Sequence, residues 1–209
     1  MTDPPSNWQG PFSALRRFAR PTPPAERCAL CGATLAAVHE HLAEPAARRL
    51  LCCCAACALL FSAGEPGRYW RVSSRLELLP DFRMSQACWL GLAAPVGLAF
   101  FYPSTPAGCV RAVFPSPAGL LESPVAAGEW DALAHENAVL HELEPDVEAL
   151  LVNRVDGPHA YYRASLDRCY ELAGIVRTHW RGFSGGPVLR EEVRRFFARV
   201  GAPFCPGGA

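Results

Sequence analysis

Two cysteine pairs constrain this chain more than any other feature of its sequence. Cys28 and Cys31 form one C-x₂-C pair, Cys54 and Cys57 form another, and 22 residues separate the pairs. Two residues between thiolates allow one tight turn to direct both sulfurs at a single ion, and this spacing is typical of a structural zinc site. Gly32, after the first pair, suits a backbone that must turn beneath a metal. The pattern predicts a four-cysteine zinc site that is closed to water, and hence structural rather than catalytic.

Three further residues leave the ligand set open. Cys52 precedes Cys54 by two positions, and His39 or His41 can each replace one thiolate on zinc. Cys52, Cys54 and Cys57 also form a C-x-C-x₂-C pattern that an iron–sulfur cluster or a redox site can use. Two C-x₂-C pairs with apolar flanking residues favour zinc over an iron–sulfur cluster. We therefore predict zinc on the four paired cysteines, with the other three residues as alternative ligands.

Composition narrows the environment and the partners of the chain. It has 209 residues, of which 50% are apolar and 19% charged, enough for a packed core. Basic and acidic residues balance at 20 each, so no net field attracts nucleic acid or anionic lipid. The N-terminus lacks the apolar segment of a signal peptide, and the apolar runs are shorter than the roughly 20 residues that span a bilayer. We expect a cytoplasmic protein without membrane contact, in which clustered cysteines bind metal rather than form disulfides.

Changes in composition along the chain predict four segments. Residues 1–26 are rich in proline and form a flexible arm, and residues 27–62 form a cysteine-rich, zinc-ribbon-like module. Residues 63–200 form an α+β domain, and residues 201–209 a flexible tail. So small a module buries too little apolar surface to fold alone, so metal binding is expected to supply most of its folding free energy.

Local patterns predict the elements of the α+β domain. Two β-hairpins are expected, one joining 97–102 to 110–114 and the other joining 147–155 to 159–165 across an Asp-Gly turn. The expected helices cover 84–92, 129–136, 166–181 and 189–200. Together these elements predict an antiparallel sheet of two hairpins with helices packed on one face.

The α+β domain offers no clear set of catalytic residues. Its densest polar group is Arg177, His179, Arg181 and Ser184, which we consider as a polar surface site, although a solvated helix end is the simpler interpretation. Ser184 lies in a motif that differs by one residue from that around the nucleophile of trypsin-like proteases. The chain lacks the histidine motif and the all-β scaffold of that chemistry. We therefore predict no catalytic residue.

Two of five stretches that carry a family resemblance contain the cysteine pairs. They are Glu-Arg-Cys-Ala-Leu-Cys-Gly at 26–32 and the apolar run at 50–61, and the others are 99–104, 144–154 and 169–186. In these stretches the chain resembles an uncharacterised actinobacterial domain family encoded beside uptake nickel–iron hydrogenase genes and their maturation factors. The resemblance implies a gene neighbourhood rather than a reaction.

From the cysteine site and this resemblance we expect a non-enzymatic, metal-stapled accessory or adaptor protein. Its partner would be a hydrogenase subunit or a maturation factor. One alternative is a redox or iron–sulfur carrier that uses Cys52, Cys54 and Cys57. Another is a nucleic-acid-binding zinc ribbon, which the neutral charge disfavours.

Overall fold

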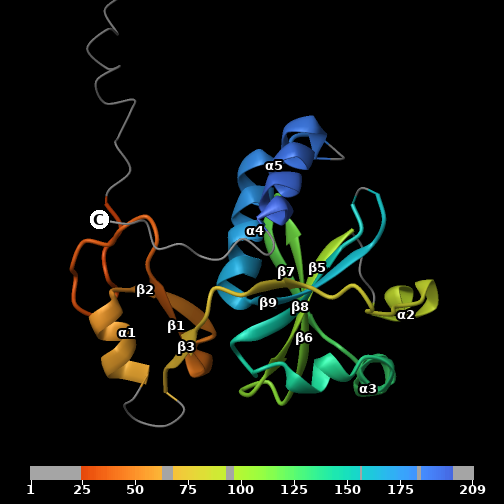
Figure 1. The fold of residues 1–209 in the computed structure, drawn as a ribbon, viewed down its shortest axis with the longest axis horizontal. Coiled ribbons are helices and arrows are strands. Elements are labelled where there is room, and N and C mark those ends of the chain that lie inside the picture. Colours follow the sequence, from red (N-terminus) through yellow and green to blue (C-terminus); the bar gives the residue numbers. More distant parts are fainter. Residues whose placement is uncertain (1–24, 63–67, 93–96, 156, 183–184, 200–209) are drawn as a thin grey trace, which may run out of the picture.

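Two antiparallel sheets organise the molecule (Figure 1). A computed structural model describes residues 25–62, 68–92, 97–155, 157–182 and 185–199. The predicted tail lies outside these residues, as does the predicted N-terminal arm apart from its last two positions. A three-stranded sheet belongs to the cysteine module, and a six-stranded sheet forms the centre of the larger domain. The predicted α+β class is confirmed.

The cysteine module consists of a knuckle, which is the turn that carries Cys28 and Cys31, followed by a hairpin and a helix. Strands β1 (Glu40–Glu44) and β2 (Arg49–Cys53) form the hairpin, and the 3₁₀ turn η2 (Pro45–Ala47) joins them. Helix α1 (Ala55–Ser62) begins directly after β2. We expected a ribbon, but the second cysteine pair lies at the start of this helix. The reason is visible in α1 itself, where a uniformly apolar run of small residues and leucines lacks the alternation of a strand.

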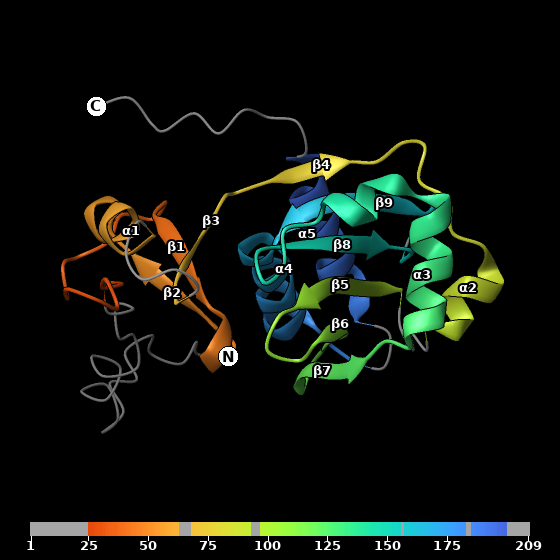
Figure 2. The ribbon, with the colours of Figure 1, turned by 90° about the horizontal axis from the view of Figure 1, so that it is seen from below.

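The small sheet extends past residue 62, where we expected the module to end. Strand β3 (Trp70–Val72) pairs with the free edge of β1, with Val72 opposite His41. The chain then continues into β4 (Leu76–Leu78), which is an edge strand of the six-stranded sheet. One extended stretch therefore contributes to both sheets and links them (Figure 2).

The six-stranded sheet has the spatial order β4-β9-β8-β5-β6-β7 (Figure 2). Beside β4, its strands are β5 (Leu98–Ser104), β6 (Cys109–Ser116), β7 (Gly119–Pro124), β8 (Glu148–Asn153) and β9 (Ala160–Ser165). The two predicted hairpins are β5–β6 and β8–β9, and they pair through β5 and β8 at the centre of the sheet. The outer strands β4 and β7 were not predicted.

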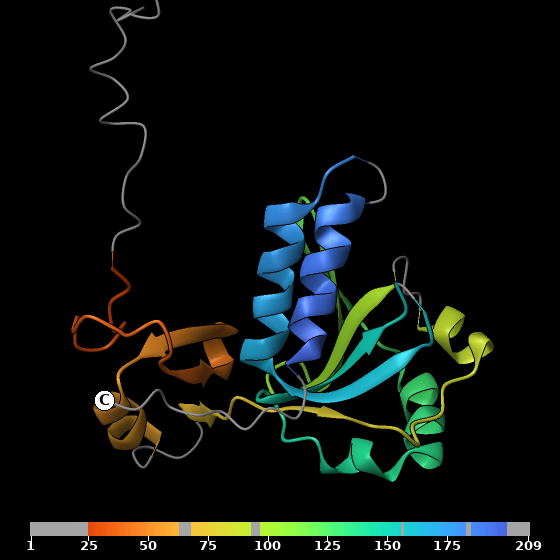
Figure 3. The same cartoon turned by 45° about the horizontal axis from the view of Figure 1, so that its top comes forward.

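Helices cover both faces of this sheet, so the expectation of helices on one face is wrong. On one face α4 (Leu166–His179) and α5 (Gly186–Ala198) lie side by side (Figure 3). On the other face lie α2 (Gln86–Gly91), α3 (Ala127–Glu136) and the 3₁₀ helix η3 (Ala138–Glu142). The physical reason lies in the central strands, whose apolar runs bury both sets of alternate side chains instead of leaving one set polar.

Phe100 and Phe101 illustrate this two-sided burial. The two neighbours on β5 point to opposite faces, and both are fully buried. Phe100 packs against Tyr170 of α4, whereas Phe101 packs near Trp130 of α3. The short helix α2 begins two residues after its predicted start, because the Ser85 side chain accepts a hydrogen bond from an amide of the first turn and so caps the helix there. Within the described ranges, no helix has the length and apolar character needed to cross a bilayer.

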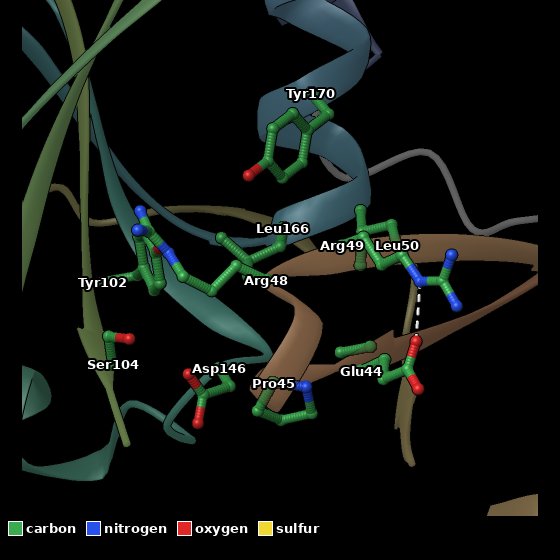
Figure 4. Close-up of a pocket in the computed structure, with 11 residues that line it drawn as sticks. Glu44, Pro45, Arg48, Arg49, Leu50, Tyr102, Ser104, Asp146, Leu166 and Tyr170 are labelled. Atoms are coloured by element: carbon green, nitrogen blue, oxygen red, sulfur yellow. Dashed lines mark hydrogen bonds and ion pairs between the residues drawn. The ribbon is translucent and has the colours of Figure 1, made fainter. Parts of the chain in front are cut away.

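The two sheets meet at a junction of mixed character (Figure 4). Apolar contact comes from Ala43 and Val72 of the small sheet against Val147, which precedes β8. Beside it, Arg48 from the β1–β2 turn forms an ion pair with Glu122 of β7. Only a small cavity of about 20 Å³ remains between the two parts at this point. The junction therefore fixes one flank of the cysteine module against the larger domain.

Candidate metal centre

The four paired cysteines come together at one end of the cysteine module. Cys28 and Cys31 belong to the knuckle, where the Gly32 amide donates to the Cys28 carbonyl at 2.8 Å. Gly32 has a φ of +75°, the left-handed conformation that favours glycine in such a turn. Cys54 directly precedes α1 and Cys57 lies in its first turn. The knuckle is anchored to the hairpin, because the amide after Cys28 donates to a carbonyl of β2.

The distances within this group fit a metal ion better than a disulfide. The ligand atoms of all four cysteines lie within 4.8 Å of one another. The sulfurs of Cys31 and Cys54 are 3.8 Å apart. Two thiolates bound tetrahedrally to zinc at about 2.3 Å lie about 3.8 Å from each other, whereas a disulfide needs about 2.05 Å. All four cysteines are free thiols, so this group can bind a metal ion.

The protonation of these thiols also suits a cation. Burial raises the pKa of Cys28, but backbone amides that donate to its sulfur, first that of Cys54, lower the pKa to about 6. Burial raises the pKa of Cys57, and the neighbouring thiols raise it further. The Cys28 thiolate therefore forms readily, while the Cys57 thiol keeps its proton. A divalent cation would remove this mutual repulsion and allow all four to ionise.

Cys53 lies among these residues but takes no part in the group. It ends β2, is fully buried, and its sulfur donates to the Glu40 carbonyl at 3.4 Å across the hairpin. Burial raises its pKa to about 11. These properties are those of a buried core thiol, which is inert.

The three alternative ligands form a second, separate group. His41 and Cys52 lie directly opposite each other in the β1–β2 hairpin, and His39 precedes His41 by two positions. The ligand atoms of these three residues lie within 4.8 Å of one another. Cys52 therefore groups with the histidines, while Cys54 and Cys57 group with the knuckle. The C-x-C-x₂-C pattern does not converge on a single site.

Three residues of the predicted polar surface site lie at the end of α4, where Arg177 and His179 occupy the last turn and Arg181 follows it. Arg177 and Arg181 are exposed, and Ser184 lies outside the described residues. The guanidinium of Arg181 donates to the carbonyls of Thr178 and Trp180, at the end of α4. This arrangement satisfies the last carbonyls of a helix.

Sequence reasoning missed an acidic residue beside the second group. Asp167, in the first turn of α4, places a carboxylate oxygen 3.7 Å from Nδ1 of His41, and its side chain is only 7% exposed. Ser74, in the link between the two sheets, donates to the same oxygen at 2.8 Å. Asp167 is far from His41 along the chain, so no local pattern could have revealed this proximity.

The comparisons with known proteins agree with the extent of the described fold. No curated protein and no solved structure matches the chain. One family model does match, and it covers residues 27–203, from the knuckle through the last helix. It therefore spans both sheets and both cysteine pairs. The chain belongs to DUF5947, a family of unknown function.

Proposed function

We propose that this protein is a non-enzymatic accessory or adaptor protein whose cysteine module is held by one structural zinc ion. The observation that carries the proposal is the convergence of Cys28, Cys31, Cys54 and Cys57 within 4.8 Å. Four cysteine ligands close the coordination sphere and leave no position for water, so such a zinc stabilises a fold instead of activating a substrate. The β1–β2 hairpin beside it gives the module its zinc-ribbon-like part.

Zinc is the metal that this ligand set favours. Tetrahedral sites of four thiolates are typical of zinc, although iron also occupies them. The two are readily separated, because zinc thiolate is colourless and iron bound to cysteine absorbs visible light. A colourless protein with zinc in the site agrees with the proposal. A coloured protein whose iron content follows the four cysteines contradicts it.

Helix α1 supports a role in binding a partner. Its residues are apolar around the whole helix up to Ser62, yet Leu59 and Leu60 are 62% and 69% exposed. A helix without a polar face is usually buried. We propose that these leucines dock on an apolar surface of a protein partner, while zinc fixes the start of the helix. The resemblance to proteins encoded beside hydrogenase genes directs the choice of partner to a hydrogenase subunit or maturation factor.

The test is affinity purification from cells that produce a nickel–iron hydrogenase. The wild-type protein is compared with a Leu59→Ser/Leu60→Ser variant, and with Leu121→Ser, which alters another exposed leucine, on β7. We expect a hydrogenase or maturation component to co-purify with the wild type and with Leu121→Ser, but not with the α1 variant. Retention of zinc without any such component would leave the metal site standing and refute the role.

A further inference from the structure

We propose that His39, His41 and Cys52 bind a second divalent transition-metal ion, with zinc as the expected metal. Their ligand atoms lie within 4.8 Å of one another. Ligands on tetrahedral zinc lie about 3.3–3.8 Å apart, so side-chain movements of about 1 Å would close the site. Two imidazoles and one thiolate form a ligand set that zinc accepts well. This site is distinct from the four-cysteine group, and the proposal does not depend on the partner proposed above.

His39 is the residue whose surroundings most directly indicate a metal ligand. Its side chain is only 10% exposed, and its Nε2 is buried without a hydrogen-bond partner in the described part of the chain. Its other ring nitrogen, Nδ1, lies 3.0 Å from the Ala36 carbonyl, which can only accept a hydrogen bond. The proton is therefore on Nδ1, and Nε2 presents a lone pair. A buried imidazole with an unsatisfied lone pair costs free energy, and coordination of a metal would recover it.

A residue of the larger domain, Asp167, is placed to orient His41 as a metal ligand. The Asp167 carboxylate lies 3.7 Å from its Nδ1, near enough to orient the ring and to form a hydrogen bond once the site tightens. A carboxylate behind a metal-bound histidine is a common arrangement, because it fixes the ring and strengthens the ligand. The rings of His39 and His41 have centroids 4.7 Å apart and are tilted by 50°, so neither ring stacks flat on the other.

The site lies at a groove and has fewer ligands than the first. All three residues line an open groove of about 850 Å³ between the cysteine module and the start of α4, and Asp167 lines it as well. Three protein ligands leave one position of a tetrahedral ion for water or another small ligand from the groove. The second zinc should therefore exchange faster than the first one, whose four ligands leave no open position.

The experiment measures the metal content and coordination of the untagged, full-length protein. We expect two zinc ions per chain, and X-ray absorption should detect nitrogen at about 2.0–2.1 Å as well as sulfur at about 2.3 Å. His39→Gln, His41→Gln and Cys52→Ser should each lose one zinc and keep the sulfur-only site. His135→Gln and Cys109→Ser, outside both groups, should retain both ions.

Two outcomes would overturn the proposal. One is a single zinc with sulfur-only coordination in the wild type, which would leave the four-cysteine site intact. The other is a second zinc that remains in all three variants. The absorption measurement on the wild type does not depend on whether a variant folds. A single zinc with mixed nitrogen and sulfur ligands would instead support this site and refute the four-cysteine site.

Asp167 supplies a test of the positioning role. Asp167→Asn should lower zinc affinity at the second site about 10–100-fold, while the first site keeps its affinity. The measurement is a competition titration against a chromophoric chelator. Glu171→Gln is the control, because Glu171 lines the same groove but pairs with arginines rather than with the histidines. An unchanged affinity in Asp167→Asn would show that Asp167 does not act on His41.

Discussion

The large sheet and the small sheet are stabilised by different means. In the described chain, the buried cluster on one face of the six-stranded sheet has 16 residues, strand residues included, and the cluster on the other face has 15. The corresponding cluster in the cysteine module has six buried residues, and three of these are cysteines. Burial of apolar surface contributes roughly 25 cal/mol per Å², so the larger domain has far more of this stabilisation. The cysteine module lacks a comparable core, and the proposed zinc takes its place.

The difference suggests how the two parts depend on each other. The larger domain closes its core with its own helices, and the module packs on it through the junction, Leu50 and the contact of His41 with Asp167. The module, in contrast, would need both the proposed metal and that junction. We therefore expect damage to the module to remain local, whereas damage to the large core should unfold the larger domain and remove the support of the module.

The largest effect is expected from loss of a thiolate ligand. Cys31 is exposed, so Cys31→Ser removes a ligand with little loss of packing. Structural zinc binding is worth about 10–16 kcal/mol in small zinc modules, so residues 27–62 should unfold without it. Limited proteolysis should then cut within the module and leave the larger domain intact. Cys109→Ser is the control, and cleavage of both regions together would contradict the separation.

In the larger domain, a large loss of stability is expected from truncation of Phe101. This ring is fully buried and has the rings of Trp89, Phe114 and Trp130 around it. Phe101→Ala should lower the free energy of unfolding of the larger domain by about 3–5 kcal/mol, because it leaves a cavity. Urea denaturation followed by tryptophan fluorescence measures this. Leu121→Ala, at an exposed site, should stay within about 0.5 kcal/mol of the wild type.

Truncation of a core residue of the cysteine module should weaken zinc binding rather than unfold the module. Leu42 is fully buried on β1. Leu42→Ala should cost about 2–5 kcal/mol, but the bound zinc would keep the module folded. The cost should appear as weaker zinc binding, about tenfold for each 1.4 kcal/mol. A chelator competition measures this, with Val38→Ala at an exposed position as the control. Unchanged zinc affinity would mean that folding of the module is independent of its metal.

The smallest effect is expected at the junction, from Glu122. Its carboxylate pairs with Arg48 of the module and Arg111 of β6, and it accepts a hydrogen bond from the Tyr102 hydroxyl at 3.0 Å. Glu122→Gln should cost about 1 kcal/mol, because these pairs are partly exposed. Urea midpoints report this cost, and Glu136→Gln, at an exposed site of α3, is the control.

The effect of Glu122 should also depend on pH. Burial raises its pKa, but Arg111, Arg48 and Tyr102 lower it more, so the pKa in the folded protein lies below its usual value of 4.5. A lowered pKa gives stability that is fully present above the unfolded value and is lost as pH falls through the folded one. The gap between wild type and Glu122→Gln should therefore be constant above about pH 5 and narrow in more acidic solution. A gap that persists in acid would exclude the ionised carboxylate as its cause.

Local patterns were sufficient to predict much of the larger domain. The Asp-Gly turn identified the β8–β9 hairpin, and the apolar stripe from Leu166 to Trp180 identified α4. Strand β7 escaped because Leu120 and Leu121 are both partly exposed, which gives no clear alternation. Helices on the second face escaped because the runs in β5 and β8 were assigned one buried face instead of two.

The cysteine module was harder to predict because its sites depend on register. The C-x₂-C spacing was sufficient to select Cys28, Cys31, Cys54 and Cys57, which the structure brings together. The start of α1 within the apolar run was not visible, since β2 and α1 share that run without a break in composition. The grouping of Cys52 with the histidines follows from its position opposite His41 in the hairpin. A shift of one residue would turn Cys52 to the other face, and sequence alone does not set that register.

Hydrogen exchange on the full-length protein, before and after removal of its metal with a chelator, tests the central claim most directly. The amides of residues 27–62 and of β3 should lose protection when the metal is removed, while those of β5, β8 and α4 keep theirs. Re-addition of zinc should restore the protection. Equal loss of protection in both regions would contradict the account, and so would a module that stays protected without metal.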